Sequence, residues 1–305
     1  MIWNKKKLVT HNGSFHADDL FATAFLALYF KGKIKIIRTR DSKKIAKGDI
    51  VYDLGGIYDA QKNKFDHHQQ GGAGKRENGI EYSSFGLVWK QFGLEFCDND
   101  LEVWKIIDDK IVAPIDAIDN GIDIIKPIFD GVIPYDLEQA FLVYSPTWEE
   151  NNINIDKIFK KQVKMIKVLL EREINVAKSE ARGKKIILDY FKNSSDKRII
   201  ISETSFPRYL FQKVLSELTE PIYFICPSGH SEKLWKVESI HKNSYTMDGR
   251  KLFPESWRGY FGSDQKQKEI IGISDITFCH RNGFLTISKS KEGAIKLAQI
   301  AVESN

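Results

Sequence analysis

The chain has 305 residues, which is long for a single hydrophobic core, so we expect two domains. Apolar residues make up 42% of the sequence and charged residues 29%, and this composition excludes an intrinsically disordered protein. The formal net charge of +5 is compatible with an anionic partner but does not by itself indicate one.

The N-terminal part of the sequence is typical of an α/β domain. In chain order it predicts a strand, a helix and two further strands, at residues 7–10, 18–30, 33–38 and 49–53. This order favours a mainly parallel sheet with flanking helices. Ligands of such sheets bind beyond the carboxyl ends of the strands, and His11 and Asp53 occupy such ends.

The middle of the chain is predicted to be mainly helical, from residue 82 to about residue 144. A polar break at residues 145–152 precedes a long helix at residues 153–181. The remainder predicts strands and helices that alternate, with strands near residues 186–188, 198–201, 222–226 and 276–278 and helices near residues 209–218 and 292–302. We therefore expect one domain at residues 1–148 and a second, C-terminal α/β domain at residues 149–305, which begins with the long helix.

The three cysteines are few, widely spaced and odd in number, which argues against a disulfide framework and a thiolate zinc site. No apolar segment of signal-peptide length precedes His11, and the longest apolar run, residues 20–30, is too short to span a bilayer. We expect a cytoplasmic protein without a membrane partner.

Four of the seven histidines stand beside aspartates near the ends of predicted strands. The stretches concerned are THNGSFHADD (10–19), VYDLGG (51–56), FDHHQ (65–69) and IDAIDNG (115–121). Imidazole and carboxylate together suit Mn²⁺, Zn²⁺, Fe²⁺ or Co²⁺, whereas a closed structural zinc site would use thiolates. Two cations about 3.5–4 Å apart also need shared carboxylates to offset their repulsion. The pattern predicts a hydrolytic metal centre that attacks phosphorus.

The order of these motifs resembles the DHH phosphoesterase superfamily. The chain is similar in its motifs to the melanocyte-proliferating-gene (MYG) family of metal-dependent 3′–5′ RNA exonucleases. The similar motifs are THNGSFHADD, YDLGGIYD, FDHHQ, SSFGLVW and IDAIDNG. FPESWRGY (253–260) and FCHRNGF (278–284) are similar to later motifs of that family, so the resemblance covers nearly the whole chain. It implies a DHH-type catalytic domain followed by a substrate-binding domain.

The resemblance also implies a set of metal ligands, which are His11, His16, Asp18, Asp53, His67 and Asp119. His11 and His16 would hold one ion, Asp53 would bridge, and the other three would complete the second site. His16 stands where the wider superfamily often has aspartate, an exchange that raises the charge of the site by one unit. The same histidine is normal in the closer family.

Further roles follow from the same resemblance. Asp53, His67 and His68 are expected to be catalytic, with His68 also facing the substrate phosphate and Asp66 fixing an imidazole tautomer. In the C-terminal domain, phosphate would be gripped by Arg258, His280 and Arg281. Arginine suits this role because its planar guanidinium binds phosphate oxygens in a bidentate way.

The glycine-rich stretch, one further arginine and two further histidines are not expected to be metal ligands. The stretch GGAGKR (71–76) lacks the Walker ending and is expected to be a mobile loop beside the metals, with Lys75 and Arg76 able to meet substrate. Arg208 is a weaker phosphate candidate than the arginines of the family motifs. His230 and His241 are expected at the surface.

These observations lead to one main functional hypothesis. We expect an Mn²⁺-dependent phosphodiesterase, using one or two ions, that removes nucleotides from the 3′ end of single-stranded RNA or DNA, with Mg²⁺, Co²⁺ and Zn²⁺ as alternative ions. A second hypothesis is a phosphohydrolase of pyrophosphate, short oligonucleotides or a nucleotide bisphosphate. A third is an RNA-binding protein with a degenerate metal site, which the presence of all six ligands disfavours. The oligomeric state is not fixed by the sequence.

Overall fold

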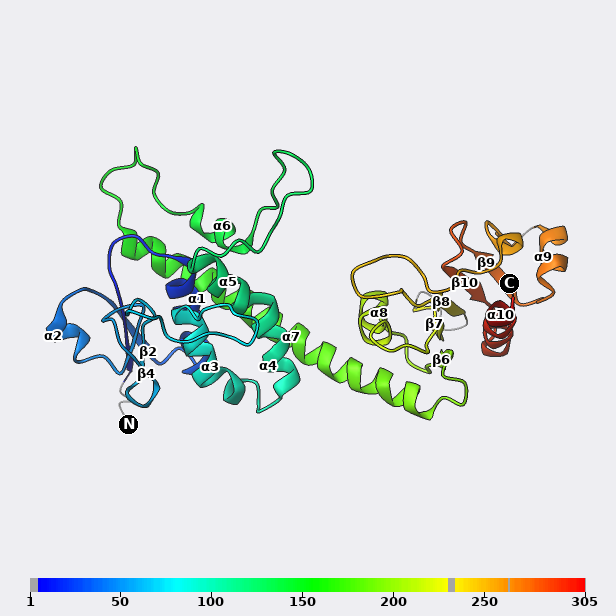
Figure 1. Cartoon of the computed structure of the whole chain (residues 1–305), viewed down its shortest axis with the longest axis horizontal. Coiled ribbons are helices and arrows are strands. Elements are labelled where there is room, and N and C mark those ends of the chain that lie inside the picture. Colours follow the sequence, from blue (N-terminus) through cyan, green and yellow to red (C-terminus); the bar gives the residue numbers. More distant parts are fainter. Residues whose placement is uncertain (1–4, 230–233, 263, 305) are drawn as a thin grey trace. The chain divides into compact units, whose positions relative to one another are not determined.

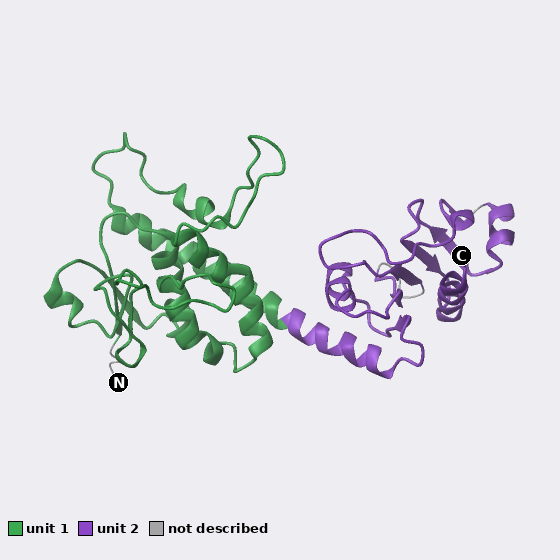
Figure 2. Cartoon of the chain, viewed as in Figure 1, with its two compact units in different colours: residues 1–178 green, residues 179–305 purple. Residues whose placement is uncertain are grey.

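The structure is a computed structural model that describes residues 5–229, 234–262 and 264–304. The chain divides into two compact units, unit 1 at Met1–Lys178 and unit 2 at Ser179–Asn305 (Figure 2). The division falls inside helix α7 (Ile155–Asn193), not at residues 148/149 as the sequence pattern suggested. The first half of α7 belongs to unit 1 because the ring of Phe159 packs on Phe15, with 5.8 Å between ring centroids.

Unit 1 contains a five-stranded sheet with the order β2-β1-β3-β5-β4. Strand β1 is parallel to β2 and β3, β3 is parallel to β5, and only the short β4 is antiparallel to its neighbour. The mainly parallel sheet is therefore confirmed. The elements of this region are β1 (Lys6–Thr10), α1 (Ala17–Tyr29), β2 (Ile34–Arg38), α2 (Ser42–Ile45), β3 (Ile50–Tyr52), β4 (Tyr58–Asp59), η1 (Ala60–Lys62) and β5 (Lys64–Phe65).

Helices α3 (Ser84–Phe96), α5 (Ala113–Asp119) and α6 (Leu137–Leu142) pack against α1 (Figure 1), whose residues from Ala17 to Leu28 are all buried. The ring of Phe25 in α1 meets Trp89 of α3 edge to face, with centroids 5.0 Å apart. The predicted helical stretch is interrupted after Asp119, where Gly121 adopts a left-handed φ of 70° that stops the helix, and helix resumes at Leu137. These helices are α3 (Ser84–Phe96), α4 (Leu101–Ile107), the π-helical turn η2 (Asp108–Val112), α5 (Ala113–Asp119) and α6 (Leu137–Leu142).

Helix α7 ends at Asn193, twelve residues beyond its predicted end at residue 181. The strand predicted at residues 186–188 is therefore wrong. Ile187 is fully buried and packs in one cluster with Leu210 and Phe211, so it continues the apolar face of the helix. A short apolar run of this kind does not distinguish a strand from a buried helical turn.

Unit 2 contains a second five-stranded sheet, with the order β6-β7-β8-β10-β9. Only β6 and β7 are parallel, and the other pairs are antiparallel. Alternate residues of β7 face opposite sides, so Phe224 packs in the cluster with α8, whereas Tyr223 packs in the cluster with α10. The elements are β6 (Ile199–Ile201), α8 (Arg208–Leu215), β7 (Tyr223–Pro227), β8 (Trp235–Ser239), η3 (Glu255–Trp257), α9 (Gln265–Ile271), β9 (Ile276–Cys279), β10 (Leu285–Ser288) and α10 (Lys291–Glu303).

The cysteines Cys97, Cys226 and Cys279 are free and buried. Burial raises the pKa of Cys97 and of Cys279 to about 12, so these thiols stay protonated at neutral pH. Among the residues that the structure describes, no helix is both long enough and apolar enough to cross a membrane.

Candidate metal centre

The histidines and aspartates singled out in unit 1 come from neighbouring strand ends. His11 follows β1, Asp53 follows β3, and the sequence Asp66-His67-His68 follows β5. These three strands are adjacent and parallel, so their carboxyl ends lie at one edge of the sheet. The start of α1 and the end of α5 bring further carboxylates to the same edge.

The structure brings all six predicted ligands into three overlapping groups. Within each group, one candidate ligand atom per residue lies within 4.8 Å of the others. The groups are His11, His16 and Asp53; His16, Asp18 and Asp119; and Asp53, Asp66, His67 and His68. Asp53 and His16 each belong to two groups, so the side chains form one continuous cluster.

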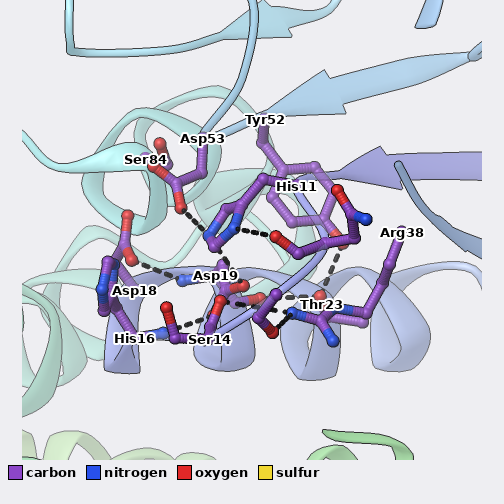
Figure 3. A network of polar contacts seen from close by, with 12 residues as sticks. His11, Ser14, His16, Asp18, Asp19, Thr23, Arg38, Tyr52, Asp53 and Ser84 are labelled. Atoms are coloured by element: carbon purple, nitrogen blue, oxygen red, sulfur yellow. Dashed lines mark hydrogen bonds and ion pairs between the residues drawn. The ribbon is translucent and has the colours of Figure 1, made fainter. Parts of the chain in front are cut away.

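Asp53 links the groups and has an unusual backbone. Its φ of 53° is left-handed, which a non-glycine residue adopts only where the surrounding structure imposes it. Its Oδ2 atom lies 3.0 Å from Nε2 of His11, a contact visible in Figure 3, and its Oδ1 atom lies 3.5 Å from Nδ1 of His68. Burial alone would raise the pKa of Asp53, but these histidines lower it below its usual value. Asp53 is therefore ionised at neutral pH.

His11 and His67 have orientations that suit metal ligands. Nδ1 of His11 lies 3.3 Å from the carbonyl oxygen of Asn12, and Nδ1 of His67 lies 3.1 Å from Oγ of Ser84. Nε2 of His67 lies 3.0 Å from Oδ2 of Asp119. With Nδ1 engaged in each case, Nε2 is the atom that faces the carboxylates, as in histidine–metal sites whose tautomer is fixed by a second contact.

Two adjacent carboxylates are buried in the first turn of α1 and carry oxygens without hydrogen bonds. Asp18 Oδ1 accepts a bond from the backbone N–H of Asp19 at 2.7 Å, and Asp19 Oδ1 accepts one from the backbone N–H of His16 at 3.1 Å. Neither Oδ2 atom makes a hydrogen bond among the described residues. Burial, followed by repulsion from Asp53, raises the pKa of Asp19 to about 8 and that of Asp18 well above its usual value.

This donor set fits a divalent metal ion. Buried carboxylate oxygens are costly when they lack partners, and a cation removes that cost. The ligands on offer are imidazole nitrogens and carboxylate oxygens, which suit Mn²⁺ and neighbouring transition metals. Asp19, which the sequence reasoning left out, places a further carboxylate beside the predicted ligands, since its Oδ2 atom lies 3.4 Å from Nε2 of His11. Its position directly after Asp18 was the available signal.

The loop between His11 and His16 is held by a second unpredicted residue, Arg38. The Arg38 side chain is only 1% exposed, and its Nη2 donates to the carbonyl oxygen of Gly13 at 2.9 Å. Nη1 lies 2.8 Å from Asp156, and the guanidinium carbon stands 4.4 Å from the centroid of the Phe159 ring. Figure 3 shows Arg38 beside the ligand loop.

A cavity of about 260 Å³ opens onto the cluster. His11, His16, Asp53 and His68 line it, together with Arg40, which the sequence reasoning also missed. Nδ1 of His68 is held by Oδ1 of Asp66 at 2.8 Å, and the side chain is 58% exposed. Asp66 thus fixes the orientation of His68, while His68 and Arg40 remain accessible to an anion.

The glycine-rich stretch does not place Arg76 at the cluster. The Arg76 side chain is 8% exposed and forms ion pairs with Asp108 and Asp116, the latter at 2.6 Å. Arg76, which the sequence left as able to meet substrate, is therefore not free to do so, because two carboxylates of unit 1 neutralise its charge. Lys75 is exposed and pairs with Glu81 at 2.9 Å.

Arg258, His280 and Arg281 lie in unit 2, and their roles remain predictions. Arg258 Nε donates to the carbonyl oxygen of Phe253 at 2.9 Å and packs against Gly283, where a Cβ atom would come within 2.6 Å of Nε. His280 Nδ1 accepts the backbone N–H of Asn282 at 3.1 Å. Arg281 is exposed.

The two histidines that were expected at the surface differ in outcome. His241 is only 8% exposed, so this expectation is wrong. Its Nε2 atom lies 3.2 Å from Nη2 of Arg208, and the contact with this neighbour keeps it inside unit 2. His230 lies outside the described residues.

Comparison with known proteins identifies the family. The model labelled MYG1 exonuclease and described as "Uncharacterised protein family (UPF0160)" matches residues 7–302. The chain belongs to this family. The MYG1 protein of Dictyostelium discoideum is 28% identical over 95% of this chain and 94% of its own length. The human MYG1 exonuclease is 26% identical over 96% of this chain and 85% of its own length.

Among solved structures, the chain is similar to RecJ from Thermus thermophilus in complex with Mn²⁺. That likeness has a TM-score of 0.28 and 10% identity, and it covers 98% of this chain. The chain spans about half of the RecJ chain, 52% of it. Membership of the MYG1 exonuclease family, together with the imidazole–carboxylate cluster, supports a metal-dependent phosphoesterase of the nuclease type.

The raised pKa values predict how stability depends on pH without metal. The pKa of Asp19 is about 8 in the folded state, so the folded protein binds more protons than the unfolded chain between about pH 4 and about pH 8. Burial alone would lower the pKa of His11 and His67, but nearby carboxylates outweigh burial and raise both pKa values. The stability that these two protonated histidines contribute is therefore also lost as the pH rises through their raised pKa values. We expect the melting temperature of the metal-free protein to fall across this window.

Thermal unfolding in a chelator and in Mn²⁺ at several pH values tests this expectation. Mn²⁺ should raise the melting temperature more at high pH, where fewer protons must leave the ligands. Asp19→Asn should flatten the slope in the chelator. A metal-free melting temperature that rises between about pH 5 and about pH 8 would contradict the assignment of buried acids.

Proposed function

We propose that this protein is a metal-dependent exonuclease that removes nucleotides from the 3′ end of single-stranded RNA, with Mn²⁺ as its ion. The observation that carries the proposal is the continuous cluster in which Asp53 and His16 each belong to two ligand groups. Its relatives' name, MYG1 exonuclease, supports a nucleic acid as the substrate.

The proposed ligands divide between two adjacent positions. His11, His16 and Asp53, which form one of the ligand groups, would hold one ion. As the family resemblance implies, Asp18, His67 and Asp119 would hold the other with Asp53 shared, and the last two lie 3.0 Å apart. When bound, the ions would supply an acidified water and would neutralise charge on the phosphate oxygens. A shared carboxylate suits this arrangement because it offsets repulsion between the cations.

Two side chains that line the cavity, His68 and Arg40, are proposed to contact the substrate directly. His68 lines the cavity, and its Nδ1–H donates to Asp66; when the imidazole carries its second proton, Nε2–H can donate a hydrogen bond to a phosphate oxygen. Arg40 lines the same cavity and adds a planar guanidinium, which binds phosphate oxygens in a bidentate way. In unit 2, Arg258, His280 and Arg281 are proposed to contact phosphates further along the substrate.

One observation favours a second candidate function. The cavity at the cluster measures about 260 Å³, below the usual range of about 300–1,000 Å³ for ligand pockets. A cavity of this size accommodates pyrophosphate or the terminal phosphodiester of a short oligonucleotide. Small-substrate phosphohydrolysis is therefore the alternative that the experiment must separate from exonuclease activity.

Product analysis on the purified full chain tests the proposal. Single-stranded RNA labelled at either the 5′ or the 3′ end is incubated with Mn²⁺, beside DNA of the same sequence and pyrophosphate. We expect a ladder of shortened products from the 5′-labelled RNA and immediate release of labelled mononucleotide from the 3′-labelled RNA. Asp18→Asn serves as the inactive control, because it removes one proposed ligand and keeps the shape of the side chain.

Three outcomes would contradict the proposal in different ways. Early release of the 5′ label would reverse the polarity. Rapid pyrophosphate hydrolysis with intact RNA would establish the small-substrate alternative. RNA binding without cleavage in Mn²⁺, Mg²⁺, Co²⁺ or Zn²⁺ would identify a non-catalytic binding protein.

A further inference from the structure

Unit 2 carries a continuous series of side-chain contacts that joins aromatic rings to an arginine. The ring centroids of Phe261 and Phe278 are 6.0 Å apart, those of Phe278 and His280 are 6.2 Å apart, and those of His280 and Phe284 are 4.3 Å apart. The guanidinium carbon of Arg208 lies 4.3 Å from the centroid of Phe284. We call these five residues the aromatic series.

The aromatic series comes from three separate parts of unit 2. Phe278 belongs to β9, while His280 and Phe284 lie in the turn between β9 and β10 (Figure 1). Phe261 is bridged to Phe278 by an isolated backbone pair, and Arg208 is the first residue of α8. Tertiary structure thus places Arg208 beside the ring of Phe284, more than seventy positions away in the sequence, and the sequence pattern did not indicate this contact.

The rings of the series remain accessible to a ligand. Phe261 is 75% exposed, and Phe278, His280 and Phe284 are each half-buried. None of these rings belongs to the buried members of the two described core clusters of unit 2, which contain fully buried aromatics such as Tyr223 and Phe224. The aromatic series therefore forms a partly exposed apolar surface beside the cores.

Fixed positive charge lies at the arginine end of the series. Arg208 Nε is 3.1 Å from Oε2 of Glu238, and Lys236 Nζ is 2.8 Å from Oε1 of the same carboxylate. Glu238 is 4% exposed, so one buried carboxylate faces two cations and the local charge stays positive. The pKa of His241, which also contacts Arg208, is lowered by burial and by that arginine, so His241 adds no charge at neutral pH.

We propose that the aromatic series binds single-stranded nucleic acid, with bases stacked on Phe261, Phe278 and Phe284 and phosphates contacted by Arg208. Proteins that bind single strands without sequence preference combine positive charge with aromatic side chains in this manner, since every base has a π-face. A purely apolar protein segment would not use the positive charge beside the rings. This inference rests on the proposed function, which it extends from the metal centre to the strand.

Binding to the metal-free full chain tests the inference without cleavage. Fluorescence anisotropy of labelled single-stranded RNA in a chelator gives Kd for the native protein and for Phe261→Ala. Because Phe261 is largely exposed, its removal should leave the fold intact, and loss of one stacking ring should weaken Kd by about fivefold or more. Phe261→Trp should restore native affinity. Tyr245→Ala is the matched control, since Tyr245 is a 95% exposed aromatic of unit 2 outside the series.

The arginine is tested through the salt dependence of the same Kd. Arg208→Gln should reduce the slope of log Kd against log salt by about one phosphate contact. Glu238 keeps its ion pair with Lys236 in this variant, so no buried charge is left unpaired.

Two results found together would overturn the aromatic series as a binding surface. The first is that Phe261→Ala and Tyr245→Ala bind RNA with equal affinity, and the second is that Arg208→Gln leaves the salt slope unchanged. A protein segment as the true occupant would give that same result. Failure of the proposed function can be distinguished from failure of this inference. The proposed function fails if the native chain with metal cleaves no phosphoester, whereas this inference is tested by binding in a chelator.

Discussion

Asp53→Asn is expected to lower turnover to less than about one hundredth of the native rate. Loss of an outer partner of a metal ligand already costs about 10–100-fold, and Asp53 is proposed to be a ligand shared by two ions. Asparagine tolerates the left-handed backbone that Asp53 adopts, so the fold should persist. Turnover and metal content per chain, measured on the same preparation, check this result.

The same variant should change the stability of the metal-free protein little, because two effects oppose each other. Removing the charge of Asp53 relieves its repulsion of Asp18 and Asp19, but it also removes the carboxylate charge that faces Nε2 of His11. We expect a melting temperature in the chelator close to the native value. Asp130→Asn, an exposed carboxylate of unit 1, is the matched control. Native turnover in Asp53→Asn would show that another residue shares the ions.

Asp116→Ala is expected to lower the free energy of unfolding by about 3–5 kcal/mol, because it removes one of the two carboxylates that pair with the buried Arg76 and leaves buried donors without their acceptor. Asp116 is fully buried, and its Oδ1 atom accepts bonds from the backbone N–H and the hydroxyl of Ser83 and from the backbone N–H of Gly86. Its Oδ2 atom pairs with Arg76 at 2.6 Å. Urea denaturation followed by circular dichroism measures the loss.

The control for this prediction is Asp109→Ala in the neighbouring turn η2. Asp109 is 59% exposed and pairs only across the surface with Lys105, so its removal should cost less than about 1 kcal/mol. Burial raises the pKa of Asp116 to about 6 despite Arg76, so ionisation remains costly even with the pair formed. A loss below about 1 kcal/mol for Asp116→Ala would mean that the pair is dispensable.

The candidate site was visible in the sequence because its residues are clustered along the chain. His11, Asp53 and His67 each follow a short apolar strand, and parallel strands align their ends without help from distant residues. The same logic predicted the mainly parallel sheet. The spacing of residues in the sequence did not show which side of α1 faces the cluster, so Asp19 was not predicted although it directly follows Asp18.

Residues whose roles depend on tertiary contacts were not predictable in this way. Arg76 follows a glycine-rich stretch that is typical of a loop, yet it is paired inside unit 1 with Asp116, forty positions away. The end of α7 was misplaced because Ile187 packs against α8, a contact that periodicity does not reveal. Sequence patterns report local geometry, whereas burial of a charge depends on partners that only the folded chain supplies.

Arg38 has a consequence for the thermodynamics of metal uptake. Its guanidinium holds the carbonyl oxygens of Gly13 and Ser14 and the side chain of Asp156 together through hydrogen bonds of the chain itself. The segment from His11 to His16 is thus preorganised, and little conformational entropy remains to be lost when a metal binds. Differences in affinity between Mn²⁺, Mg²⁺, Co²⁺ and Zn²⁺ should then reflect the preferences of the ions for imidazole and carboxylate, with little contribution from ordering of the chain.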